Sequence, residues 1–449
     1  MLSISELEGN CFLYRLHPPA IYIHERVAKN MEYRAGVDRV IEALESPVVP
    51  VEFGDGDIPD MILSQGILKN RQAMGTLEQV SDPILLFDTF RFDGRNAVAS
   101  RKRHLIGRGV PPNLCRNSLL GTGAFHWANY NLEGDPHRQD KVCRPCWRIH
   151  LQEGCVHQCK YCSFGGLLVC MMNVQEYCGY LGQIISRHPW QKTYLLDDDG
   201  DPPCLEPELG TLGTLIEYFG KQQERYLVIH TKTWNTEWMT SLRHQGNTIV
   251  LWSLSGRTQS RELEPATGTF EERVEAARIA EEAGYTVRFK FKPIIPVKNW
   301  REEADEAVEL LFQKTHPDVI SLCCFMWMDV DEMKRRLPQE MLDPWALTAA
   351  EEDREEMEGT RAKPFPQRIR KEIYQHYVKA IRKHDPKIPV TLSTENFRMW
   401  AEMGRELGYS ATNYPCGCGP QTVPGQGKLK CHPFRVAVRN DDGIPGVIG

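Results

Sequence analysis

The sequence contains no apolar run long enough to span a bilayer, and Met1-Leu-Ser-Ile4 does not begin a secretory signal peptide. It also contains no internal repeat and no low-complexity segment, which excludes solenoids and fibrous arrays. The chain has no large excess of positive charge: its net charge is −6 over 449 residues. This argues against broad nonspecific binding to nucleic acid, because that binding requires cations to neutralise phosphates. A local basic groove is still compatible with this balance. We therefore expect a soluble, cytoplasmic, globular protein.

Cysteine, in contrast, is abundant, with 15 residues that a reducing compartment would keep as thiols available to metal. The most informative are Cys155, Cys159 and Cys162, spaced C-x3-C-x2-C with an aromatic residue before the third. Three thiolates so close in sequence can hold three corners of a cubane [4Fe–4S] cluster and leave the fourth iron open. The following Gly165-Gly166 suits a backbone that passes near a bulky cofactor.

This cysteine motif resembles the signature of the radical SAM superfamily. The resemblance implies that the open iron chelates S-adenosylmethionine, whose reductive cleavage yields a 5′-deoxyadenosyl radical that abstracts a hydrogen atom from a substrate. It also implies an adenine contact at the backbone around Tyr161, and an electron donor of the flavodoxin or ferredoxin type. The alternative for the three thiols is structural zinc in a non-catalytic protein, although zinc prefers paired C-x2-C knuckles.

Strand and helix patterns alternate along the middle of the chain, which indicates an α/β fold with a parallel sheet. The pattern predicts a partial (β/α)6 TIM-type barrel at residues 147–337, between an N-terminal region (1–146) and a helical, cysteine-containing C-terminal region (338–449). The expected barrel strands are 148–151, 193–197, 226–231, 248–253, 287–295 and 318–323, and the expected helices include 34–45, 209–219, 237–244, 270–283, 304–312, 349–359, 368–382 and 396–407. Chemistry in such barrels sits at the carboxyl ends of the strands, where the cysteine loop also falls.

Several segments of this barrel resemble the spore photoproduct lyase family, which splits a UV-induced thymine dimer in DNA. They are Leu215-Ile-Glu-Tyr-Phe-Gly220, Ile229-His-Thr-Lys232, Trp252-Ser-Leu254 and the run that begins Glu264-Pro-Ala-Thr-Gly268. The resemblance implies that Lys232 and Ser253 contact S-adenosylmethionine at the ends of successive strands. It also implies that the loop containing Asp201 borders the methionine part of that cofactor, and that the substrate is nucleic acid or a nucleotide.

The sequence departs from this family at Asp198, which falls where the family has its radical-quenching cysteine. A carboxylate cannot replace a thiol as a hydrogen-atom donor, because its O–H bond is far too strong. Either another residue quenches the product radical, or the enzyme acts on a small molecule or peptide in a biosynthetic pathway. Asp198 and its acidic neighbours can bind a cationic or hydroxyl-rich substrate, take a proton or hold a metal, and they can equally form an ordinary solvated turn.

A second group of cysteines lies outside the motif: Cys143, Cys146, Cys416, Cys418 and Cys431. Together they can supply the ligands of an auxiliary iron–sulfur cluster or a zinc ion. The alternative is that one of these thiols is a hydrogen donor or covalent participant near the barrel mouth.

Overall fold

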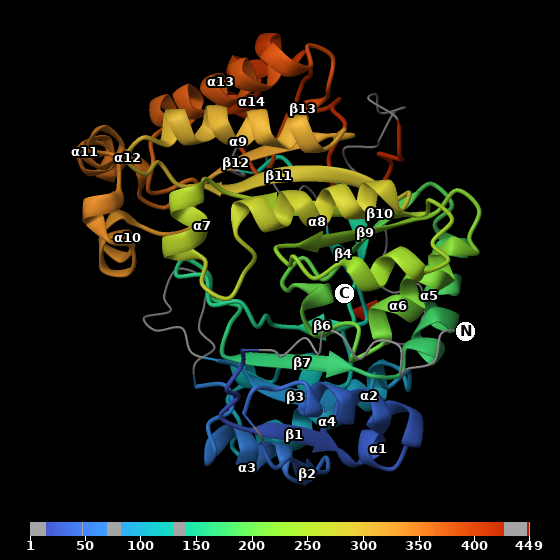
Figure 1. Cartoon of the computed structure of the whole chain (residues 1–449). Coiled ribbons are helices and arrows are strands. Elements are labelled where there is room, and N and C mark those ends of the chain that lie inside the picture. The colour runs from blue at the N-terminus through green and yellow to red at the C-terminus, as the bar shows by residue number, and fades with distance from the viewer. Residues whose placement is uncertain (1–14, 47, 70–81, 129–140, 426–446, 449) are drawn as a thin grey trace.

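The computed structural model describes residues 15–46, 48–69, 82–128, 141–425 and 447–448. They form two mostly parallel sheets, one of five strands and one of nine. Figure 1 shows the smaller sheet in the lower part of the view and the larger sheet above it, with helices packed on the outer side of each. No described helix has both the length and the apolar character needed to cross a membrane.

The five-stranded sheet joins the N-terminal region to the segment around the cysteine motif. Its strand order is β2-β1-β3-β7-β6, and only the β6–β7 pair is antiparallel. Its strands are β1 (Ile21–His24), β2 (Val51–Phe53), β3 (Ile84–Asp88), β6 (Gln152–Glu153) and β7 (Leu167–Met171). The cysteine loop, residues 154–166, runs from β6 to β7, so the small sheet fixes both of its ends.

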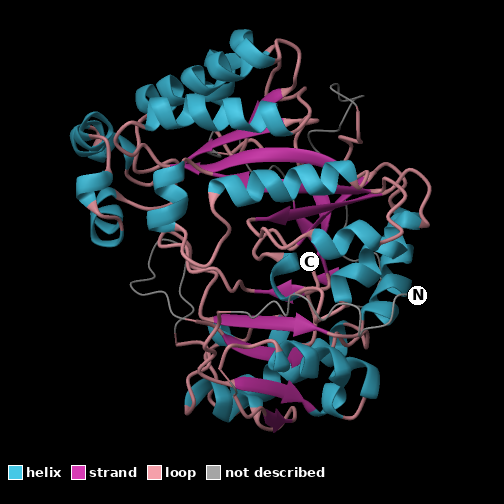
Figure 2. Ribbon diagram, viewed as in Figure 1, coloured by secondary structure: helices cyan, strands magenta, loops and turns pink. Residues whose placement is uncertain are grey.

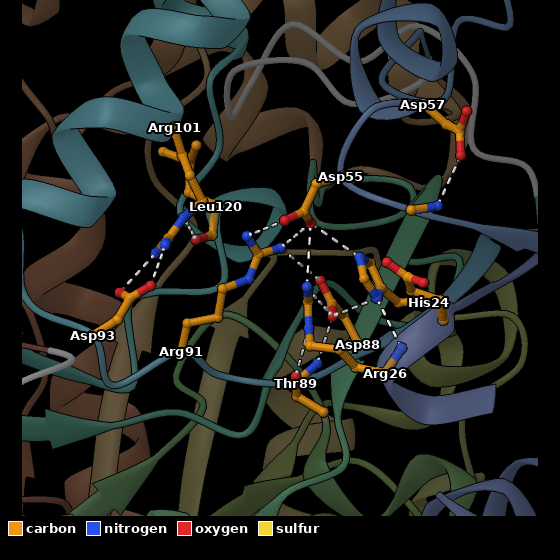
Figure 3. A network of polar contacts seen from close by, with 12 residues as sticks. His24, Arg26, Asp55, Asp57, Asp88, Thr89, Arg91, Asp93, Arg101 and Leu120 are labelled. Atoms are coloured by element: carbon orange, nitrogen blue, oxygen red, sulfur yellow. Dashed lines mark hydrogen bonds and ion pairs between the residues drawn. The ribbon is translucent and has the colours of Figure 1, made fainter. Parts of the chain in front are cut away.

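A partly buried polar network holds the carboxyl ends of β1 and β3 together (Figure 3). His24 Nε2 lies 3.0 Å from Asp55 Oδ1, and Arg26 donates a 2.8 Å hydrogen bond to Asp88. Arg91 donates to both carboxylate oxygens of Asp55. His24 and Asp88 are fully buried. Buried charges are tolerated when each is paired in this way, and the network thus fixes the edge of the small sheet.

The nine-stranded sheet has the order β13-β12-β11-β10-β9-β8-β5-β4-β14. Its six central strands, β5 to β12 in this order, are parallel neighbours, as expected for an open (β/α)6 partial barrel. The strands are β4 (Phe125–Ala128), β5 (Cys146–Ile149), β8 (Thr193–Leu196), β9 (Tyr226–Thr231), β10 (Thr248–Leu254), β11 (Thr286–Ile294), β12 (Ile320–Cys324), β13 (Val390–Leu392) and β14 (Val447–Ile448). The predicted fold class is therefore confirmed, whereas the division at residues 146 and 337 stays a prediction.

Helices cover the outer face of the large sheet, as Figure 2 shows. Contacts of α6 with β9 and β10, of α8 with β10 and β11, and of α13 with β12 build this layer. The helices are α1 (Glu25–Ala28), α2 (Met31–Glu42), α3 (Ile58–Leu63), α4 (Arg95–Gly107), α5 (Val174–Arg187), α6 (Thr211–Gly220), α7 (Arg257–Leu263), α8 (Phe270–Glu282), α9 (Trp300–Lys314), α10 (Val330–Arg336), α11 (Pro344–Glu352), α12 (Arg354–Met357), α13 (Gln367–His384) and α14 (Phe397–Leu407).

Two helix predictions were wrong. The segment expected to be a helix at 237–244 is a short 3-10 turn, Glu237–Ser241, because His244 is held elsewhere: it stacks on Tyr285 and its Nε2 lies 3.0 Å from the Ala283 carbonyl oxygen. The helix expected at 349–359 begins earlier, where the Asp343 side chain caps α11 and proline occupies its first position. It ends at Glu352, and the short α12 follows.

The inner face of the large sheet is unusually polar at β11. Arg288 and Lys290 point inward, while Phe289 and Phe291 pack outward into the core beneath the helices. Successive side chains of a strand point to opposite faces, so the alternating sequence of β11 places a row of cations inside the partial barrel.

The C-terminal segment 415–425, which we call the floor segment, closes the amino ends of the barrel strands. The Pro420 carbonyl accepts hydrogen bonds from the backbone N–H groups of Lys192 and Thr193, where β8 begins. The Gly417 carbonyl accepts a 2.9 Å bond from Arg288 near the start of β11. The floor segment and the cysteine loop therefore lie at opposite ends of the barrel interior.

Candidate active site

A cavity of about 1050 Å³ occupies the interior between the cysteine loop and the large sheet. It brings together residues that the sequence analysis drew from distant parts of the chain. The predicted site residues that line it are Cys155, Cys159, Tyr161, Cys162, Asp198, Asp201, Lys232 and Ser253, together with Cys143 and Cys418.

The cysteine loop is closed by a 3.0 Å hydrogen bond from the Cys155 N–H to the Phe164 carbonyl. Backbone N–H groups also point at sulfur: His157 N–H donates to Cys155 Sγ at 3.4 Å, and Phe164 N–H to Cys162 Sγ at 3.5 Å. All three cysteines are free, and burial raises the pKa of each thiol. Thiolates in this loop therefore need a cationic partner. Backbone N–H groups that donate to cysteine sulfur, as here, also adjust the reduction potential of iron–sulfur clusters. The three sulfurs with their N–H donors therefore suit a cluster.

The three thiols do not converge on one point. Within the described ranges, no three or more Cys, His, Asp or Glu side chains are grouped so that they could hold a single metal ion. This spread is compatible with a cubane cluster, in which each thiolate binds a different iron.

Asp201 fastens the cysteine loop to the end of β9. Its carboxylate accepts hydrogen bonds from Thr231 Oγ1 at 2.6 Å and from the Lys232 backbone N–H at 2.7 Å. On its other side, Asp201 Oδ2 lies 2.8 Å from Nε2 of His157, which belongs to the cysteine loop. Asp201 is buried, and these three contacts occupy both oxygens of its carboxylate. Its side chain therefore positions the loop.

Glu264 is a buried anion that organises the cavity wall beside the loop. It receives the Lys232 ammonium at 2.9 Å, the Arg273 guanidinium at 2.6 Å and the Tyr161 hydroxyl at 2.6 Å. Burial alone would raise the pKa of Glu264, but Lys232 and Arg273 outweigh it and hold this pKa well below its usual range. Lys232 is thus held in place at the cavity rather than extended into solvent.

Ser253 lies on the inner face of β10 and contacts His230 on β9, with 2.7 Å between Oγ and Nε2. Burial and the nearby lysines, Lys290 foremost, lower the pKa of His230 well below its ordinary value. The imidazole is therefore neutral at pH 7, and the pair can donate or accept hydrogen bonds without adding charge.

In the acidic loop after β8, one carboxylate accepts backbone hydrogen bonds and its neighbour forms an ion pair. Asp197 is buried with a left-handed backbone (φ 42°) and accepts a 3.1 Å bond from the Leu151 N–H, which ties β8 to the end of β5. Asp198 forms an ion pair with Arg148. Burial raises the pKa of Asp198, but Arg148 outweighs it and lowers this pKa to about 2. Asp198 is therefore an ionised carboxylate at the cavity wall.

A family model described as "Spore photoproduct lyase" matches residues 143–329, which include the cysteine loop and the strands from β5 to β12. This part of the chain is similar to the spore photoproduct lyases, which are radical SAM enzymes. The spore photoproduct lyase of Clostridium acetobutylicum is 25% identical over 178 residues, which are 38% of this chain and 53% of that protein. That of Bacillus subtilis is 25% identical over 163 residues, which are 35% of this chain and 48% of that protein. The chain thus aligns with about half the length of these curated relatives.

The fold is shared over a greater length. A spore photoproduct lyase solved in complex with dinucleoside spore photoproduct superposes with a TM-score of 0.56 at 14% identity, covering 84% of this chain and 98% of that one. A mutant lyase with bound AdoMet and dinucleoside spore photoproduct gives a TM-score of 0.55 at 15% identity over the same shares. The predicted family, and with it the radical SAM class of enzyme, is confirmed.

The sequence analysis of this radical SAM protein missed several residues that build the cavity. Those that line the cavity are His157, Arg148 and His230, and the basic residues Lys141, Lys290, Lys292, Arg361 and Lys363. Glu264 holds Lys232, which lines the cavity. His230 and Glu264 lie in the segments that resemble the lyase family, but the resemblance assigned them no role. The β11 lysines carried a signal of their own: positively charged residues alternate with phenylalanine in a strand, and one of its two faces must then bury charge.

The cysteines proposed as auxiliary ligands are only partly brought together. Cys143 and Cys418 line the cavity, Cys416 Sγ lies 3.8 Å from Cys418 Sγ, and Cys146 is buried in β5. Cys431 lies outside the described residues. A second cluster or zinc site in this radical SAM protein stays a prediction.

Replacing His157 by alanine should destabilise the protein and loosen the cysteine loop. The change removes one of the two partners of Asp201 Oδ2 and leaves the Lys232 N–H as the other. Loss of a hydrogen bond to a charged group costs about 1.5–3 kcal/mol. We expect a matching loss in the free energy of unfolding in urea, and less iron bound per chain after anaerobic reconstitution. His316→Ala is the control, because the side chain of His316 is 95% exposed. Equal stability and equal iron content in the two variants would show that the His157–Asp201 contact does not hold the loop.

Proposed function

We propose that this chain is an enzyme that removes a hydrogen atom from an anionic substrate, a nucleotide or nucleic acid, inside the partial barrel. The observation that carries the proposal is the composition of one cavity: the three-cysteine loop forms one wall, and inward-facing lysines of β11 form another. Radical chemistry and anion binding are thus supported in one enclosed space.

We assign Cys155, Cys159 and Cys162 to a [4Fe–4S] cluster. S-Adenosylmethionine then lies beside Lys232, Ser253, the loop of Asp201 and the backbone around Tyr161. When bound, these groups supply one-electron cleavage of the sulfonium and a 5′-deoxyadenosyl radical. The chain's own residues position them: Asp201 holds the loop to β9, and Glu264 fixes the Lys232 ammonium and the Tyr161 hydroxyl.

The charge of the cavity favours an anionic substrate. Eight lysine and arginine side chains and four carboxylates are among the described residues that line it. Of the carboxylates, Asp198 pairs with Arg148 and Glu153 with Arg116, so little negative charge is left to balance Lys290 and Lys292. In an enclosed site such cations attract phosphate or carboxylate groups strongly. The dinucleoside bound in the solved lyases supports a nucleotide substrate.

A second candidate is an anionic small molecule or peptide in a biosynthetic pathway. The observation that favours it is the Asp198–Arg148 ion pair, which occupies the position where the resemblance expects a quenching thiol. Under either candidate, we propose a cytoplasmic reaction with a flavodoxin- or ferredoxin-type electron donor. All cysteines within the described ranges are free, which supports a reducing compartment.

The test is anaerobic reconstitution with iron and sulfide, followed by incubation with S-adenosylmethionine, dithionite and dinucleoside spore photoproduct. The proposal expects a brown protein that forms 5′-deoxyadenosine and restores thymine dinucleoside. Deoxyadenosine without restored thymine would reject lesion repair and favour the second candidate. A colourless protein that retains zinc would reject an enzymatic role.

Replacing Lys292 by methionine should weaken substrate binding without stopping radical formation. The ammonium lies 5.0 Å from the centre of the Trp327 ring and faces the cavity, so the change removes a charge and retains most of the side-chain volume. Loss of one charged contact costs about 1.5–3 kcal/mol, which raises KM about tenfold to a hundredfold. Substrate-free deoxyadenosine formation should be unchanged. Lys298→Met, at an exposed position just after β11, is the control. An unchanged KM for the Lys292 variant would contradict anion binding at β11.

A further inference from the structure

Two cysteines of the floor segment lie at the bottom of the barrel interior. Cys418 lines the same cavity as the cysteine loop and packs against a small apolar cluster formed by β8, β9 and β10. The neighbouring Gly417 carbonyl is held by Arg288, and the Gly419 carbonyl accepts a hydrogen bond from Thr193 Oγ1. The backbone on both sides of Cys418 is thus fixed to the strands.

The turn at this point brings two sulfurs together. Cys416 Sγ lies 3.8 Å from Cys418 Sγ, and the Gly419 N–H donates a 3.0 Å bond to the Cys416 carbonyl. A Cβ atom at Gly419 would lie only 2.6 Å from Cys416 Cβ, and one at Gly417 only 2.8 Å from Ser321 Oγ. Glycine at position 419 therefore allows the close approach of the two cysteines, and glycine at position 417 allows the floor segment to pack against β12. The Lys290 ammonium lies 3.7 Å from Cys418 Sγ, where it stabilises negative charge on the pair.

We propose that Cys416 and Cys418 act as one dithiol that gives a hydrogen atom to the carbon radical in this cavity, the step that Asp198 cannot perform. This inference rests on the radical chemistry proposed above. It places the donor on the floor segment, at the end of the interior opposite the cysteine loop.

The step balances when the pair carries one proton, as a thiol hydrogen-bonded to a thiolate. The S–H bond breaks and a C–H bond forms on the substrate. The thiyl radical left behind joins the neighbouring thiolate in a two-centre, three-electron S–S bond. That radical anion passes its extra electron to a one-electron acceptor of the iron–sulfur or flavodoxin class and leaves a Cys416–Cys418 disulfide. Lys290 stabilises the single negative charge that the pair holds before and after the hydrogen transfer.

Other described thiols are placed less well for this step. Cys204 packs in the separate core beneath the small sheet. Cys323 is fully buried with its sulfur 3.3 Å from Thr394 Oγ1. Cys115 and Cys143 do line the cavity, so they are the competing donors that an experiment must separate from Cys418.

The first test is turnover of dinucleoside spore photoproduct by the reconstituted holoenzyme in D2O, because a thiol exchanges its hydrogen with solvent. We expect deuterium in the product and, by peptide mass after alkylation, a disulfide between Cys416 and Cys418. Both should require S-adenosylmethionine and reductant. Cys416→Ser and Cys418→Ser should each retain formation of 5′-deoxyadenosine and lower labelled product at least tenfold. Cys178→Ser, in α5 outside the cavity, should retain the label.

A second test needs no substrate. In substrate-free turnover in D2O, 5′-deoxyadenosine itself should acquire deuterium from the pair, and Cys418→Ser should remove that label. The inference is overturned if wild-type deoxyadenosine carries no deuterium, if Cys418→Ser retains it, or if Cys143→Ser or Cys115→Ser alone removes it. Loss of bound zinc or iron from Cys416→Ser would also overturn it in favour of a metal site. A wild-type protein that forms no deoxyadenosine at all rejects instead the function proposed above.

Discussion

Replacing Cys155 by alanine is expected to abolish cleavage of S-adenosylmethionine completely. Cys155 is one of the three thiols of the cysteine loop, all of which line the cavity, and its sulfur already receives a backbone hydrogen bond of the kind that stabilises thiolate. A cubane bound by three thiolates cannot be held stably by two, because the second iron left open is exposed to exchange and loss. We expect loss of the visible charge-transfer absorption after anaerobic reconstitution and no 5′-deoxyadenosine above a protein-free control.

The control for this change is Cys178→Ala, in which a thiol of helix α5 far from the motif is removed. It should bind iron and cleave S-adenosylmethionine as the wild type does. Urea unfolding of both apo variants checks that neither has lost its fold. Wild-type levels of deoxyadenosine from Cys155→Ala would reject the cluster assignment, since the remaining motif has only two thiols.

Replacing Glu264 by alanine is expected to cause the largest loss of stability at the site. The fully buried carboxylate balances two cations, Arg273 and Lys232, and both would be left in the interior without it. Removing one partner of such a buried set costs about 3–5 kcal/mol, measured as the free energy of unfolding in urea at pH 7. Glu262→Ala is the matched control. Its partner is Arg261 at the surface, so we expect a loss under about 1 kcal/mol.

The contribution of Glu264 should also depend on pH in one direction. Its pKa in the folded protein lies below the ordinary value of 4.5, so its ionised form is stabilised by folding. This stabilisation is fully present above about pH 4.5 and is lost as the pH falls through the lower folded-state pKa. The stability difference between wild type and Glu264→Ala should therefore be constant from pH 6 to 8 and shrink in acid. A difference that grows in acid would contradict the ion-pair interpretation.

Local sequence patterns predicted the barrel well. The β-branched and apolar runs of β9, β10 and β12 are short-range signals, and the structure has a strand at each of them. The helix predicted at 270–283 is also present as α8, and the structure shows a local capping box of Thr269 with Glu272 at its start. The expected helix at 237–244 failed because stacking of His244 on Tyr285, 41 residues away in sequence, overrides local preference. The sequence also did not reveal that β6 and β7 belong to the small sheet, since strand pairing across 80 residues leaves no local pattern.

In the candidate active site, too, short-range patterns were predictable from the sequence and long-range contacts were not. Spacing alone brought Cys155, Cys159 and Cys162 together, because residues three and four positions apart are necessarily close in a loop. The contacts of Glu264 with Lys232, of Arg148 with Asp198 and of His157 with Asp201 each join residues 30 or more positions apart, and no spacing rule predicts them.

The sequence alone predicts how a radical would be made: three thiols at fixed spacing, at the carboxyl end of a parallel sheet, in a chain whose motifs resemble the lyases. It also predicts that Asp198 is no hydrogen donor, because that follows from the strength of an O–H bond. The folded structure was needed to show that Asp198 is neutralised by Arg148 and that the β11 lysines face inward. It alone showed that Cys416 and Cys418, more than 250 residues after the motif, lie at the bottom of the same interior. Chain connectivity fixes neighbours within a loop, whereas the packing of a C-terminal segment against strand ends is settled only when the whole chain folds.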